Sequence, residues 1–156
     1  MIISSEKQML KVANKLGSNL VNNISQNLII YLKGELGSGK TTFSKGLIKG
    51  MGFKGLITSP TFSIIERIEI LEFCILHIDL YRIDRPEEIF ELELHEEPNN
   101  SKPTLMIIEW PERGHNLILP PDIEIIFSTT KDINERSIEL LSQSNKLGNK
   151  VTFWLE

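Results

Sequence analysis

The sequence predicts an α/β fold, with a mixed, mostly parallel sheet that is flanked by helices and carries one antiparallel hairpin. Two short apolar runs, Leu28–Leu32 and Leu105–Ile108, have the length and composition of strands buried on both faces. A helical segment follows the first run, because Phe43, Leu47 and Met51 recur every fourth residue. Strands that alternate with helices in this way usually form a parallel sheet through right-handed crossovers.

An N-terminal helix is predicted to begin after Ser5, since Ser5 and Gln8 have the spacing of a capping box. The apolar residues that follow fall on one helical face: Met9, Val12, Ala13, Leu16 and Leu20. Such a helix could cover the sheet, or it could approach a ligand bound near the first strand. Covering the core is the simpler role.

The middle of the chain predicts the hairpin. Phe62–Ile70 and Phe73–Ile78 have strand composition, and the few residues between them favour an antiparallel pair. Pro86 can begin a short helix over Glu87–Leu94. Three closing strands are expected after the second buried run: Ile123–Phe127, Ser137–Leu141 and Val151–Leu155. Because 156 residues suit one hydrophobic core, the whole chain, residues 1–156, is expected to be a single domain.

Residues 34–41 read Gly-Glu-Leu-Gly-Ser-Gly-Lys-Thr and fit the phosphate-binding pattern G-x-x-x-x-G-K-[ST]. The segment lies between a predicted strand and a predicted helix, which is the context that the pattern requires. Its glycines and the free N–H groups of the following helix can surround a polyphosphate. Lys40 would contact the β- and γ-phosphates, and Thr41 would offer its hydroxyl to Mg²⁺. Thr42 either touches the α-phosphate or simply begins the helix. The sequence therefore predicts a P-loop NTPase.

Two of the apolar runs end in an acidic residue, at Asp79 and at Glu109. In a parallel sheet the carboxyl ends of the strands ending at Leu32, Ile78 and Ile108 would meet at one edge, where open α/β sheets bind ligands. Either acid could hold Mg²⁺ or position water beside a nucleotide. The spacing does not decide which acid touches the metal.

Thr61 belongs to the segment Ser59-Pro60-Thr61, which follows the predicted P-loop helix. A threonine in this place could act as a switch that senses the γ-phosphate. An ordinary proline turn would account for the same three residues equally well.

Composition limits the other function classes. A net charge of −4 argues against a generic nucleic-acid-binding surface, which needs a basic patch. The one cysteine, Cys74, lies in an apolar run and is expected to be buried, and no Cys/His spacing suggests zinc. His77 lies within a strand pattern and is expected to be structural. With no signal-peptide pattern and no apolar stretch long enough for a bilayer, the protein is expected in the cytoplasm and away from membranes.

Four segments occur in order along the chain: Gly34–Gly46, Ser59–Phe62, His77–Arg82 and Ile108–Glu112. Together they resemble the bacterial TsaE family, the small ATPase of tRNA threonylcarbamoyladenosine synthesis. The similarity covers most of the chain, and the last three segments are more specific than the first. The resemblance implies an ATP-binding, weakly hydrolysing protein that acts with the TsaB and TsaD proteins in forming threonylcarbamoyladenosine beside the anticodon of tRNA. It would then reach tRNA indirectly, through that complex.

The resemblance also implies roles for individual residues. Thr41 and Glu109 would be the Mg²⁺ ligands, with Asp79 supporting the metal or positioning water. Thr61 would belong to the switch-like loop, and Lys40 to the catalytic set. The phosphates would be held by consecutive residues of the loop: Gly37, Ser38, Gly39, Lys40, Thr41 and Thr42.

Three further positions follow from the same resemblance. Glu6, near the start of the first helix, and Arg136, before a late strand, would contact the nucleotide. Trp110 would lie at the rim of the active site, although packing is an alternative role for this side chain.

Three alternatives remain beside a partner-directed ATPase. A small-molecule kinase would usually need an arginine-bearing lid, whereas Arg82, Arg85 and Arg113 are scattered along the chain. A GTP switch would be expected to show Asp-x-x-Gly and Asn-Lys-x-Asp motifs, but Asp79 is followed by Leu-Tyr-Arg and no base-reading motif is present. The third alternative is a nucleotide-binding scaffold without meaningful turnover.

Overall fold

A seven-stranded mixed sheet is the centre of the computed structural model, which describes residues 1–132 and 134–146. The strands have the order β1-β7-β6-β2-β5-β4-β3. Their bounds are β1 Ile2–Ile3, β2 Leu28–Lys33, β3 Ile65–Glu69, β4 Cys74–Asp79, β5 Thr104–Glu109, β6 Ile123–Thr129 and β7 Arg136–Ser142. The helices are α1 Glu6–Val21, α2 Lys40–Gly50, α3 Pro86–Glu91 and the 3₁₀ helix η1 Pro111–Gly114.

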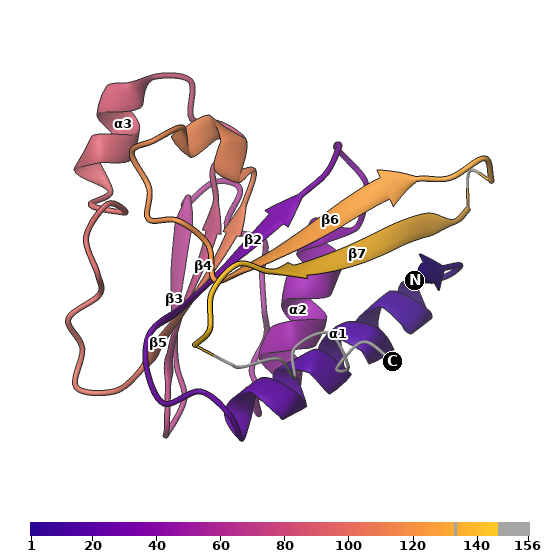
Figure 1. Ribbon diagram of the computed structural model, residues 1–156, viewed down its shortest axis with the longest axis horizontal. Coiled ribbons are helices and arrows are strands. Elements are labelled where there is room, and N and C mark those ends of the chain that lie inside the picture. Colours follow the sequence, from indigo (N-terminus) through magenta and orange to yellow (C-terminus); the bar gives the residue numbers. More distant parts are fainter. Residues whose placement is uncertain (133, 147–156) are drawn as a thin grey trace.

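Strands β6, β2, β5 and β4 run parallel, whereas β3 and β7 are antiparallel to their neighbours β4 and β6. The predicted α/β class, the mixed sheet and the hairpin are therefore confirmed. The connections from β2 to β5 and from β4 to β5 place helices or long loops between parallel neighbours, as such pairs require. In Figure 1 the sheet crosses the middle of the molecule, with the helices at its two sides.

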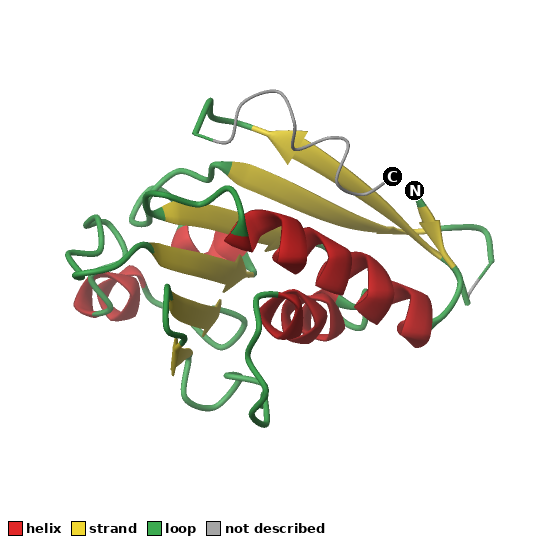
Figure 2. Cartoon of the chain, turned by 90° about the horizontal axis from the view of Figure 1, so that it is seen from below, coloured by secondary structure: helices red, strands yellow, loops and turns green. Residues whose placement is uncertain are grey.

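Helices α1 and α2 pack on one face of the sheet, and α3 and η1 lie toward the other (Figures 1 and 2). Side chains of β2 alternate between these two layers, as the two-residue period of a strand requires. Leu28, Ile30 and Leu32 belong to the core beneath α1 and α2. Ile29 and Tyr31 belong to the second core, together with residues of α3 and the loops around it. Burial on both faces explains why this strand reads as an uninterrupted apolar run.

The capping pattern at Ser5 is confirmed. The Ser5 hydroxyl accepts a hydrogen bond from the Gln8 backbone N–H at 3.2 Å, which satisfies one free donor at the start of α1. The Gln8 side chain in turn accepts from the Ser4 N–H at 2.9 Å. Helix α1 covers the core, and its amino end lies beside the glycine-rich loop.

Helices α1 and α2 approach closely because glycines face the contact. A Cβ added to Gly17 would lie 2.2 Å from the carbonyl oxygen of Leu47, and one added to Gly50 would lie 2.1 Å from that of Asn14. The Ser18 hydroxyl reaches across the same contact and donates to the Gly50 carbonyl at 3.1 Å. No side chain larger than hydrogen fits at these two positions without moving a helix.

Several predicted boundaries differ from the observed ones. The strand predicted over Phe62–Ile70 begins only at Ile65, because the chain after Pro60 forms local turn bonds, including Ile64 N–H to the Pro60 carbonyl at 2.6 Å. Phe62 is consequently 82% exposed. The helix predicted over Glu87–Leu94 ends at Glu91.

One observed strand was not predicted, and one predicted strand lies beyond the part of the chain that the structure describes. Strand β1, which pairs with β7, was not predicted, because two residues are too short to show a period. The closing strand predicted over Val151–Leu155 lies outside the described residues. None of the described helices combines the length and the apolar composition that a membrane span would need.

We expect Gly17→Ala to lower the free energy of unfolding. Alanine would improve helix propensity by about 1 kcal/mol. A backbone contact at 2.2 Å can be relieved only by moving one helix, and overpacking of this kind costs ~1–3 kcal/mol or more. Urea denaturation followed by circular dichroism measures the difference, with Lys15→Ala, an exposed position of the same helix, as the control. A Gly17→Ala variant more stable than the wild type would contradict the packing.

Candidate functional site

The glycine-rich loop joins β2 directly to α2, and its backbone adopts conformations that favour glycine. Gly39, the residue before the first turn of α2, has a left-handed φ of 103°, and Gly37 has a φ of 73°. A Cβ on Gly34 would lie 2.6 Å from the Phe127 carbonyl oxygen on the neighbouring strand β6. The loop therefore curls over the amino end of α2, where free N–H groups and the helix dipole favour an anion.

Lys40 extends back into this loop. Its Nζ donates to the carbonyl oxygens of Gly34 and Glu35 at 2.6 and 2.9 Å, and lies 3.9 Å from the centroid of the Trp110 ring. Burial lowers the pKa of Lys40, and the nearby carboxylates of Glu109, Glu112 and Asp79 act in the opposite direction. The ammonium group is thus fixed at the centre of the loop by the backbone and by one aromatic face.

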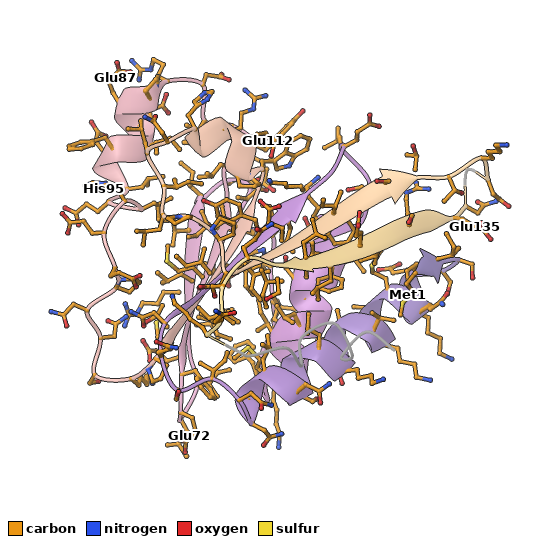
Figure 3. All side chains as sticks on the ribbon, viewed as in Figure 1. Met1, Glu72, Glu87, His95, Glu112 and Glu135 are labelled. Carbon is orange, nitrogen blue, oxygen red and sulfur yellow. The ribbon has the colours of Figure 1, made fainter. Side chains whose placement is uncertain are left out.

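Trp110 follows β5 with a left-handed φ of 58°, an unusual backbone conformation for a large side chain. Its indole ring contacts Tyr81, with the ring centroids 4.9 Å apart, as well as Lys40. The prediction that Trp110 lies at the rim of the site agrees with this position. Trp110 is half-buried there, and Glu112, labelled in Figure 3, lies two residues further along the chain, on η1.

Glu109, at the carboxyl end of β5, is only 1% exposed. Its Oε2 accepts from the Thr41 hydroxyl at 2.9 Å, and its Oε1 lies 2.9 Å from the Ser44 hydroxyl and 2.8 Å from His77 Nε2. A buried carboxylate is tolerated when hydrogen-bond donors surround it. Glu109 therefore joins β5 to α2 and to β4.

Asp79, at the end of β4, holds the segment that contains Thr61. Its Oδ2 accepts from the Thr61 hydroxyl at 2.9 Å, and its Oδ1 accepts from the Tyr81 backbone N–H at 3.0 Å. The Ser59 and Thr61 hydroxyl oxygens are 2.6 Å apart. Asp79 thus attaches the turn after α2 to the sheet edge, through its carboxylate and through its backbone N–H, which donates to the Ile64 carbonyl at 2.9 Å.

The register of the sheet explains why these residues meet. Glu109 pairs with Leu32 on one side and with Asp79 on the other, so the ends of β2, β5 and β4 lie level. The predicted meeting of three carboxyl ends at one edge is therefore confirmed.

Two hollows border the glycine-rich loop and share four lining residues, Gly37, Ser38 and Gly39 of the loop and Thr42 of α2. The first, of about 310 Å³, is also lined by Leu36, Lys40, Thr41, Thr61, Asp79, Tyr81, Glu109 and Trp110. The second, of about 290 Å³, is also lined by Ile3, Ser5, Glu6, Met9, Asn134 and Arg136.

All the residues predicted for the site line one hollow or the other. Glu6 and Arg136, which come from opposite ends of the sequence, share the wall of the second hollow. Thr42 lies in the first turn of α2 and borders both, so beginning the helix and facing a ligand are compatible roles.

Two side chains that hydrogen-bond to Glu109, those of Ser44 and His77, were not predicted as site residues. Ser44 lies one helical turn after Thr41, and His77 lies two residues before Asp79. Both spacings place the side chains on the faces that carry predicted site residues, so periodicity was an available signal. The resulting set of groups suits an anion held by backbone N–H groups and a lysine, beside a hard cation held by hydroxyl and carboxylate oxygens.

Comparisons with known proteins agree with this architecture. The family model described as "Threonylcarbamoyl adenosine biosynthesis protein TsaE" matches residues 3–138. A Haemophilus influenzae protein named tRNA threonylcarbamoyladenosine biosynthesis protein TsaE is 33% identical over 96% of this chain and 92% of its own length. A Rickettsia felis protein of the same name is 36% identical over 94% of this chain and 81% of its own length.

A solved structure shows the same fold. The crystal structure of YdiB from Bacillus subtilis superimposes with a TM-score of 0.73, covering 99% of this chain and 91% of that one at 21% identity. The family match spans strands β2 to β6, the glycine-rich loop and both acidic strand ends. The chain therefore belongs to the TsaE family.

Proposed function

We propose that this protein binds ATP with Mg²⁺, hydrolyses it slowly, and thereby supports the formation of threonylcarbamoyladenosine beside the anticodon of tRNA. The observation that carries the ATPase proposal is the Thr41–Glu109 pair, whose oxygens are 2.9 Å apart at the mouth of a glycine-rich loop that contains Lys40. The tRNA part of the proposal is supported by the names of the relatives.

The residues of the first hollow fit a magnesium–triphosphate group. Mg²⁺ is usually bound through one or two protein oxygens together with phosphate oxygens and water, and Thr41 Oγ1 and Glu109 Oε2 would supply the protein's share. When bound, the ion would neutralise charge on the β- and γ-phosphates. The second hollow, with Glu6 and Arg136 on its wall, would then receive the base and sugar.

The residues of the first hollow divide into groups with different tasks in this proposal. Lys40 and the loop N–H groups hold the phosphates and oppose their charge. Asp79, oriented by the Tyr81 N–H, and Glu109 are the two carboxylates that can position the attacking water. Thr61 links Asp79 to a turn that could respond to the γ-phosphate.

Slow turnover by the isolated chain is part of the proposal. Of the described residues, those that line the first hollow include no arginine. An arginine that contacts the transferred phosphate is worth ~10³–10⁵ in rate in other P-loop enzymes. We propose that a complex with the TsaB and TsaD proteins in the cytoplasm supplies such a group or orders the Thr61 turn, and that tRNA is reached through this complex.

Lys40→Ala should weaken ATP binding by ~10- to 100-fold, since a hydrogen bond to a charged group contributes ~1.5–3 kcal/mol. Isothermal titration calorimetry of the isolated chain measures the change. Lys49→Ala, which removes an exposed lysine at the other end of α2, is the matched control. Equal affinities of the wild type and Lys40→Ala would exclude the loop as the phosphate site.

Glu109→Gln should reduce Mg²⁺-dependent hydrolysis by at least the ~10- to 100-fold typical of groups around a metal. The substitution keeps the shape of the side chain but removes its charge, so ATP binding without Mg²⁺ should change little. Release of inorganic phosphate, followed as a function of Mg²⁺ concentration, measures the effect. The control is Glu87→Gln on α3, which lies far from the loop (Figure 3). An unchanged Mg²⁺ dependence would remove Glu109 from the metal site.

Reconstitution tests the cellular role. With TsaB, TsaD and unmodified tRNA, adding this chain and ATP should increase the number of modified tRNA molecules per complex, and inorganic phosphate should be the second product. Lys40→Ala should abolish the increase. A phosphorylated small molecule in place of inorganic phosphate would indicate a kinase, and an equal preference for GTP would contradict the assignment of ATP.

A further inference from the structure

His77 lies on the same face of the sheet as the two acidic strand ends. It precedes Asp79 by two residues on β4 and pairs with Ile107 of β5, so Glu109 lies two residues further along the neighbouring strand, on the same face. The imidazole is completely buried, with its Nε2 2.8 Å from Glu109 Oε1. Diagonal neighbours on adjacent strands are within reach of a side chain as long as histidine.

Ser44, the other hydrogen-bond neighbour of Glu109 Oε1, cannot substitute for the hydrogen bond from His77. The Ser44 hydroxyl lies 2.9 Å from Oε1, but it also lies 3.1 Å from the Lys40 carbonyl oxygen, and both of these atoms are acceptors. A serine hydroxyl has only one proton to donate. Among the described residues, His77 is therefore the donor to Oε1 that no other acceptor shares.

The hydrogen bonds also indicate which ring nitrogen carries the proton. A carboxylate oxygen accepts, so the proton must lie on Nε2. Nδ1 is buried and has no hydrogen-bond partner in the described part of the chain. Within residues 1–132 and 134–146, Glu109 is thus the one hydrogen-bond partner of the ring, so the contact fixes the ring and the carboxylate relative to each other.

We propose that His77 is a positioning residue for Glu109: by holding Oε1, it keeps Oε2 turned toward Thr41 and the bound Mg²⁺. This inference rests on the proposed ATPase function and replaces the expectation that His77 is merely structural. Residues that orient a metal ligand through a hydrogen bond typically change metal affinity or activity ~10- to 100-fold when they are replaced.

Two amide variants test the proposal, because glutamine and asparagine carry the same amide group on side chains that differ by one methylene in length. In His77→Gln the amide nitrogen can occupy the place of Nε2 and donate to Glu109, whereas in His77→Asn the side chain is too short. The measured quantity is the Mg²⁺ concentration at which half of the Mg²⁺-dependent gain in ATP affinity is reached. We expect His77→Asn to raise this concentration ~10-fold. We expect it to stay within about threefold of the wild type in His77→Gln. Binding of a fluorescent ATP analogue, titrated with Mg²⁺, measures this without relying on turnover.

Two control measurements distinguish a loss of Glu109 orientation from a loss of folding. ATP affinity without Mg²⁺ should be the same in all variants, and thermal unfolding shows whether each one folds. If His77→Asn does not fold, His77→Met, which keeps volume but donates no hydrogen bond, takes its place in the comparison with His77→Gln. His95→Gln, near α3 and away from the loop, is the matched control (Figure 3).

The possible failures are distinguishable. If the wild type responds to Mg²⁺ and the Gln and Asn variants share one Mg²⁺ requirement, the role of His77 is overturned while the ATPase proposal stands. If the wild type itself shows no Mg²⁺-dependent change in ATP affinity, the proposed function fails and this inference fails with it.

Discussion

One buried carboxylate, that of Glu109, connects the parts of the site. It receives hydrogen bonds from Thr41 on α2 and from His77 on β4, while its own backbone belongs to β5. A buried charge without such donors would cost several kcal/mol. The position of α2, and with it the curl of the glycine-rich loop, is therefore coupled to the register of β4 against β5. The carboxylate of Glu109 therefore acts on the local fold.

The glycines on the facing sides of α1 and α2 have a comparable role on a larger scale. Gly17 and Gly50 let the two helices approach until backbone meets backbone, which brings the amino end of α1 beside the loop. Met9 of α1 would lie 2.8 Å from a Cβ on Gly39. The hollow that contains Glu6 and Arg136 exists because this packing closes one of its sides.

The turn after α2 is attached differently from the rest of the site. Thr61 contacts Asp79, but the neighbouring apolar side chains Leu56 and Phe62 are 85% and 82% exposed. Segments with few buried apolar contacts open at low free-energy cost. The buried Ile57 and the hydrogen bond from the Asp79 N–H to the Ile64 carbonyl at 2.9 Å anchor the two ends of this turn. The part around Thr61 and Phe62, which the Thr61–Asp79 contact holds, is therefore the part that opens most easily.

The sequence by itself determined strands β2 to β7, though not all their bounds, and the glycine-rich loop, because these depend on local patterns. The apolar run at Leu28–Leu32, the capping Ser5 and the glycine-rich pattern all express preferences that act over a few residues. Since strand ends carry the acids, the pattern also indicated that Asp79 and Glu109 would lie at one edge. The bounds of β3 were missed, since the turn bonds after Pro60 compete with strand pairing.

Only the tertiary structure decided which side chains share a hydrogen bond. His77 and Glu109 are 32 residues apart, and their contact depends on how β4 and β5 align. Glu6 and Arg136 meet at one hollow because α1 packs against α2 and β7 lies near the edge of the sheet. Such contacts arise from packing between distant segments, whose register and spacing no local pattern encodes.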